Sequence, residues 1–174
     1  LASFRVEQYP EKVCVVCAIQ TKATTKQPMK EEFYKIFKPQ LTPKKMLELG
    51  VFGGSYFIDE NIEEFPKSWF KEAKLSKTFD VSLNRFKTKS GLSRKEWIDR
   101  GWIFKEDPLG WFQWYCRFAK GRRIPNIDRI QIKRWKAFGD RHIPAIKKNC
   151  DEGDMQCRRR QRQAVLQWAY NPFF

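Results

Sequence analysis

The stretch GWFQWYCRFAKGRR, residues 110–123, is the most distinctive part of the sequence, and the expected fold is built around it. Asp107-Pro108 stands just before it and favours the start of a helix, while Gly121 favours its end, so we predict a helix over residues 108–119. Apolar side chains occur on nearly every side of this helix, which is typical of a helix in the middle of a core. The rest of the chain is therefore expected to pack around it.

Shorter helices are predicted on both sides of this stretch. Residues 42–50 begin with Thr-Pro and end with Gly, and residues 93–100 begin with Ser followed three residues later by Glu, a capping-box pattern. Gly139 and Pro144 are expected to break or bend the chain. The remaining helices are predicted over 65–74, 127–138 and 155–168.

The N-terminal part of the chain is expected to differ from the rest. A β-branched run at residues 13–19 predicts a short strand, so we divide the chain into an N-terminal extension with this strand and a loop (1–40) and a helical basic domain (41–174). The predicted fold is mainly α, a compact bundle of about six short helices with a small N-terminal β element. Because the first residue is Leu1 rather than Met, the chain is expected to be part of a larger protein.

Composition points to a folded, strongly basic protein. Of the 174 residues 41% are apolar, with 15 Phe and 7 Trp, which is enough for a packed core and argues against global disorder. The net charge is +15. No run approaches the 18 apolar residues that a membrane span needs, so no membrane contact is expected.

The type of basic residue changes along the chain. Residues 1–90 contain 2 Arg and 14 Lys, whereas residues 91–174 contain 12 Arg and 7 Lys. Arginine offers a planar set of donors that fits phosphates and guanine edges and stacks on bases, so this change favours recognition over simple solubility. We predict a nucleic-acid-binding domain, with duplex DNA ahead of RNA, and weigh against it an interaction module for an acidic or phosphorylated protein segment. The expected phosphate contacts are Arg117, Lys120, Arg122, Arg123, Arg129, Lys133, Arg158, Arg159 and Arg162.

Aromatic residues next to this basic half suggest a second kind of contact. Trp102 and Trp111 flank a short connection between two predicted helices, and Asp107 lies between them. Tryptophans can stack on bases and a carboxylate can accept a hydrogen bond from a base amino group, so this loop is predicted to read a base. The same parts would suit a base-excision enzyme, with Asp107 as general base. No catalytic residue is assigned, and a binding module without catalysis is favoured.

The cysteines do not form a regular framework. There are five, an odd number without repeated spacing, which favours a reducing compartment; with nucleic acid as the ligand, a nuclear, chromatin-associated protein is expected. Cys14 and Cys17 have the spacing of a zinc knuckle but lie in an apolar run, and Cys150 and Cys157 can either join a metal site or pair with each other. No metal or other cofactor is predicted.

Overall fold

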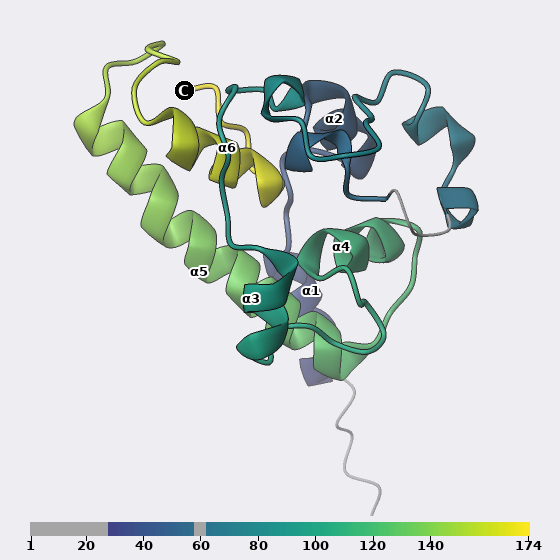
Figure 1. Cartoon of the computed structure of the whole chain (residues 1–174). Coiled ribbons are helices and arrows are strands. Elements are labelled where there is room, and N and C mark those ends of the chain that lie inside the picture. Colours follow the sequence, from purple (N-terminus) through teal and green to yellow (C-terminus); the bar gives the residue numbers. More distant parts are fainter. Residues whose placement is uncertain (1–27, 58–61) are drawn as a thin grey trace, which may run out of the picture.

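The computed structural model describes residues 28–57 and 62–174, and this part of the chain is mainly helical (Figure 1). It contains no strand; the predicted β element at residues 13–19 lies outside the described residues. The α-helices are α1 (Pro28–Ile36), α2 (Pro43–Leu49), α3 (Arg94–Asp99), α4 (Trp111–Ala119), α5 (Pro125–Asn149) and α6 (Arg159–Gln167). Short 3₁₀ turns lie between them at Phe52–Gly54 (η1), Ile62–Glu64 (η2), Lys67–Trp69 (η3) and Val81–Leu83 (η4).

Helix α4 is the centre of the core, as the sequence predicts. Trp114 is fully buried and Phe112 is 1% exposed. The ring of Phe37, which follows α1, packs edge-on against Trp135 of α5 and tilted against Trp114, with centroids 4.9 and 5.3 Å apart. The helix begins at Trp111 rather than at 108, because Gly110, the preceding residue, has a φ of 95°.

The two capped helices also form where they were predicted. The Thr42 hydroxyl accepts a hydrogen bond from the Lys45 N–H at the start of α2. At α3, Ser93 and Glu96 form the reciprocal capping box. The predicted helix over 65–74 is wrong, since only the short turn η3 forms there.

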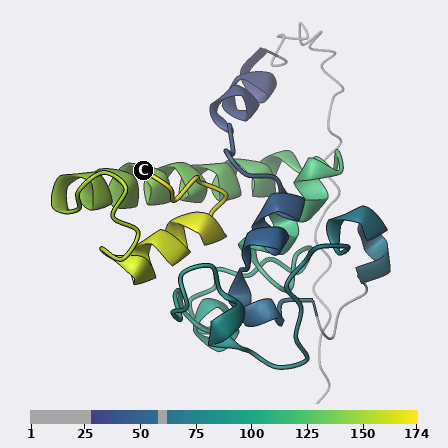
Figure 2. The ribbon, with the colours of Figure 1, turned by 90° about the horizontal axis from the view of Figure 1, so that it is seen from above.

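Helix α5 corrects the expectation of a break after residue 138. It runs without interruption through Gly139 and Pro144 to Asn149 and forms one long edge of the molecule (Figure 2). Gly139 makes room for Tyr170: a Cβ at this position would lie 2.2 Å from the Tyr170 hydroxyl, which donates a hydrogen bond to the Trp135 carbonyl. Pro144 is on an exposed face of the helix. The glycine is thus a packing residue here, not a helix stop.

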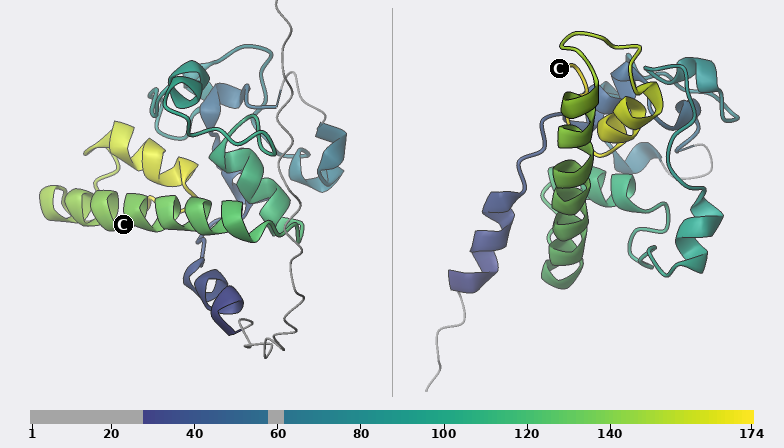
Figure 3. Two further views of the ribbon diagram at one scale, coloured as in Figure 1. Left: turned by 90° about the horizontal axis from the view of Figure 1, so that it is seen from below. Right: turned by 90° about the vertical axis from the view of Figure 1, so that its left-hand side faces the viewer.

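Helix α6 starts later than the sequence predicts. Cys150 and Cys157 form a disulfide, one of the alternatives left open by the sequence, and residues 151–157 make a loop between α5 and α6. Arg158 then has a left-handed backbone (φ 53°), so the helix begins only at Arg159. Helices α5 and α6 lie side by side (Figure 3).

The C-terminal segment closes over earlier parts of the chain. The side chain of Gln163 donates to the Gly50 carbonyl at 3.2 Å and accepts from the Phe86 N–H at 3.1 Å. The Ala169 carbonyl accepts from the N–H groups of Gln40 and Leu41 at 2.8 and 3.1 Å. Segments more than 70 residues apart in the sequence are joined in this way.

The end of α1 and the residues after it pack on the rest of the described chain. Phe37 is 8% exposed and belongs to the same core as α4 and α5. The Tyr34 hydroxyl donates to the Asp128 carboxylate at 2.8 Å, and Asp128 also accepts from the Trp114 indole at 2.8 Å. Phe37 thus belongs to the core of the predicted domain that begins at residue 41. Within the described residues no helix has the length and apolar character needed to cross a membrane.

Candidate functional site

Several arginines predicted to contact phosphate are engaged inside the protein. Arg117 donates to Glu64 at 2.6 Å and to Asp107 at 3.1 Å, and Arg122 donates to the other Asp107 oxygen at 2.6 Å. Asp107 has no exposed surface. The hydrogen bonds from Arg117 hold the pKa of Glu64 below its usual value. These groups fasten the turn η2 and the loop before α4 to α4 itself, so Arg117 and Arg122 have structural partners.

Other arginines bind backbone carbonyls. Arg159 donates to the Phe86 carbonyl at 2.6 and 2.9 Å from two of its nitrogens. Arg162 has no exposed surface and donates to the Pro172 carbonyl at 2.6 Å. Arg159 and Arg162 are thus bonded inside the protein without an acidic partner. Carbonyl oxygens act as acceptors that a count of acidic residues leaves out.

A row of exposed basic side chains follows one side of α5, with Arg129 5.3 Å from the centroid of the Phe33 ring and Lys147 5.2 Å from that of Phe174. Arg129, Lys133, Lys136 and Lys147 recur at helical spacing on one side and are all exposed. At a rise of 1.5 Å per residue this row, which we call the α5 basic row, is about 27 Å long. Within it Lys136 pairs with Asp140 at 2.5 Å, whereas Lys133 has no ion pair in the described part of the chain. The row is long enough to follow a phosphate backbone rather than a single phosphate.

The other predicted contacts lie elsewhere on the surface. Arg123 is exposed and its guanidinium lies 3.6 Å from the centroid of the Phe118 ring. Arg158 is exposed at the start of α6, where it bonds Gln161 at 3.1 Å. Lys120 is exposed and donates to the Glu64 carbonyl. None of these three belongs to the α5 basic row.

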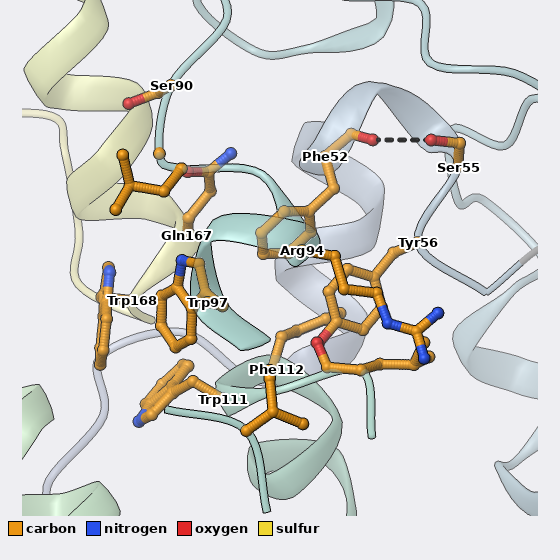
Figure 4. A pocket seen from close by; sticks show the side chains of 14 residues that line it. Phe52, Ser55, Tyr56, Ser90, Arg94, Trp97, Trp111, Phe112, Gln167 and Trp168 are labelled. Carbon is orange, nitrogen blue, oxygen red and sulfur yellow. Dashed lines mark hydrogen bonds between the residues drawn. The ribbon is translucent and has the colours of Figure 1, made fainter. Parts of the chain in front are cut away.

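A cavity of about 290 Å³ opens beside α4 and is mostly aromatic (Figure 4). Its walls come from η1 and the residues after it, the segment 90–97, the loop before α4, α4 itself and the end of α6. Trp97, Trp111 and Trp168 lie on one side, and Phe52, Tyr56 and Arg94 lie on the other. The described residues that line it are Phe52, Ser55, Tyr56, Ser90, Gly91, Leu92, Arg94, Trp97, Ile103, Leu109, Trp111, Phe112, Gln167 and Trp168, and none of these is acidic.

Some polar groups at this cavity form hydrogen bonds within the protein, and others do not. The Tyr56 hydroxyl donates to the Leu109 carbonyl at 2.6 Å, and the Trp111 indole donates to the Gln131 carbonyl at 3.3 Å. Gln167 is only 6% exposed, yet its side-chain amide forms no hydrogen bond with any described residue. Among the described residues Arg94 bonds only the Pro108 carbonyl, to which its Nε donates at 3.1 Å. The cavity therefore presents one free amide and the two terminal nitrogens of a guanidinium.

The structure brings only part of the predicted base-reading loop to this cavity. Trp111 lines it but is 4% exposed, and Trp102 packs edge-on against Trp97 outside the lining. Asp107 faces Arg117 and Arg122 instead. Sequence reasoning missed the roles of Arg94 and Gln167, which no local pattern marks because each meets the cavity only through folding of distant segments.

No metal centre is found in the part of the chain that the structure describes. It contains no group of three or more His, Cys, Asp or Glu residues placed to hold an ion. The sulfurs of Cys150 and Cys157 are bonded to each other, and Cys14 and Cys17 lie outside the described residues.

Comparison of the chain with models of known protein families, with curated proteins and with solved structures finds no match.

Proposed function

We propose that this chain is a nucleic-acid-binding domain that contacts phosphates through the α5 basic row, with duplex DNA ahead of RNA. The observation that carries the proposal is the exposed row of Arg129, Lys133, Lys136 and Lys147 on one side of a straight helix. Basic side chains that neutralise phosphates release condensed counterions, which favours binding and makes it depend on salt. The net charge of +15 attracts a polyanion over a longer range.

The row replaces the phosphate-binding set predicted from the sequence. Arg117, Arg122, Arg159 and Arg162 stabilise the fold through the bonds described above, and of the predicted set only Arg129 and Lys133 belong to the row. We do not propose base excision, because none of the described residues that line the aromatic cavity carries a carboxylate, and Asp107 is buried between two guanidinium groups. A nuclear location remains part of the proposal.

The test is a fluorescence-anisotropy titration of labelled duplex DNA and RNA at several salt concentrations. Lys133→Ala with Lys147→Ala should weaken binding and reduce the slope of log affinity against log salt by about 2, since each phosphate contact contributes roughly 0.9. The matched control is Lys67→Ala with Lys71→Ala, which removes the same charge from the exposed surface of η3 and the residues after it, far from α5 (Figure 1).

Equal loss of affinity in both pairs would show that only net charge matters and would contradict the assigned surface. Absence of nucleic-acid binding at low salt, together with tight binding of an acidic or phosphorylated peptide, would replace the proposal by the rival interaction module.

A further inference from the structure

The aromatic cavity lies apart from the α5 basic row, and its chemistry points to a ligand of its own. Six aromatic rings line it, and four of them, including Trp97 and Trp168, keep part of their surface accessible. Accessible aromatic rings favour a flat partner that can stack on them, and every nucleobase has such a face. A volume of about 290 Å³ lies at the lower end of the range for small-ligand pockets, which suits one ring system rather than several.

The polar groups narrow the choice of ligand. The side-chain amide of Gln167, which is bonded to no other described residue, offers both a donor and an acceptor, the combination that pairs with the edge of a base. The two terminal nitrogens of Arg94 can donate bidentate hydrogen bonds to a phosphate. The bond from its Nε to the Pro108 carbonyl holds the guanidinium in place.

The charge at the cavity argues against a cationic ligand. Aromatic cages also bind methylated ammonium groups, but such a group would meet the positive charge of Arg94, and no carboxylate stands among the described residues that line the cavity. A flat ring that carries an anion fits both features.

We propose that the cavity binds one nucleotide unit, with the base against the aromatic wall, Gln167 on the base edge and Arg94 on the adjoining phosphate. The unit is an unpaired residue of a nucleic acid, and in this respect the inference rests on the nucleic-acid binding proposed above. A base must leave the helical stack to enter a cavity, which costs least where it is already unpaired. The protein should therefore prefer nucleic acid that contains an unpaired base.

The experiment compares three labelled duplexes of equal length by anisotropy: fully paired, with one bulged adenine, and with an abasic residue in place of that adenine. The bulged adenine should bind about tenfold more tightly than the abasic bulge, as stacking of one base predicts. Gln167→Met keeps the side-chain volume but removes the amide, and Arg94→Ala removes an exposed guanidinium. Gln167→Met should lose most of the tenfold preference. Arg94→Ala should instead weaken binding of both bulged duplexes, because each of them carries the phosphate.

Arg100→Ala is the matched control. Arg100 follows α3, is exposed, and its guanidinium lies 5.1 Å from the centroid of the Trp102 ring, outside the cavity lining. This variant should keep the preference for the bulged adenine. A second arm follows the indole N–H signals by NMR during titration with AMP, with ribose 5-phosphate and with a trimethyl-lysine peptide.

The outcomes separate the two proposals. If all three duplexes bind equally and AMP shifts no indole signal, the cavity proposal is overturned while the α5 basic row stands. If no duplex binds but AMP does, and Arg94→Ala abolishes this, the cavity takes free nucleotides and the proposed function falls. Binding of the trimethyl-lysine peptide in preference to AMP would overturn the nucleotide assignment.

Discussion

At the scale of single residues, Asp107 is predicted from the sequence to contact a base, but in the structure it is bonded inside the protein. Its two oxygens accept from Arg117 and Arg122 at 3.1 and 2.6 Å, and it has no exposed surface. A carboxylate in this position holds two guanidinium groups against the core. If its charge is removed, the two guanidinium groups stay partly buried but lose the carboxylate that they share.

We expect Asp107→Asn to lower the free energy of unfolding by about 3 kcal/mol, because breaking one side of a buried ion pair is costly. Asp99→Asn is the control: its pair with Lys95 has side chains 56% and 83% exposed, and such pairs contribute at most about 1 kcal/mol. Urea denaturation of both variants measures the difference. Similar midpoints for the two would mean that Asp107 does not stabilise the fold through its arginines.

At the scale of secondary structure, the two helix-breaking residues inside α5 should respond to substitution in opposite ways. Gly139→Ala should destabilise the protein by about 1–3 kcal/mol despite the better helix propensity of Ala, since the added Cβ meets the Tyr170 ring. Pro144→Ala should stabilise it by about 1 kcal/mol or more, because Pro144 is exposed and Ala restores a helix hydrogen bond. Thermal unfolding tests both; a stabilising Gly139→Ala would disprove the packing role of this glycine.

Features that depend on neighbouring residues could be predicted from the sequence, whereas features that depend on distant residues could not. The start of α3 depends on Ser93 and Glu96, three residues apart, so a local pattern is enough to find it. The packing role of Gly139 in α5 depends on Tyr170, and the bonding of Arg117 depends on Glu64, which is 53 residues away. Contacts of this kind are absent from any local window. The candidate cavity is the extreme case, since its walls come from four separate segments of the chain.

At the scale of the whole molecule, the disulfide links redox state to stability. Bonding Cys150 to Cys157 closes a short loop and should contribute about 2 kcal/mol by restricting the unfolded chain. Reductant should therefore lower the urea midpoint of the parent protein but leave that of Cys150→Ser with Cys157→Ser unchanged. Equal midpoints of the parent with and without reductant would show that the bond does not stabilise the fold.

The state of this pair in cells also bears on location. Disulfides persist mainly in oxidising compartments, whereas the cysteine count and the proposed ligand favour the reducing nucleus. Trapping of free thiols in intact cells, followed by mass spectrometry, tests the nuclear assignment directly: a fully oxidised pair would count against it.

The bonds that Gln163 and Ala169 make with residues 40, 50 and 86 have a consequence for biosynthesis. A ribosome releases residues 40–86 long before residues 163–170. The later segment includes the buried Val165 and Leu166, so the earlier segments emerge without the residues that pack over them. Contacts this distant in sequence also form slowly. Until α6 has been synthesised, these earlier segments are therefore open to chaperones and to other nascent chains.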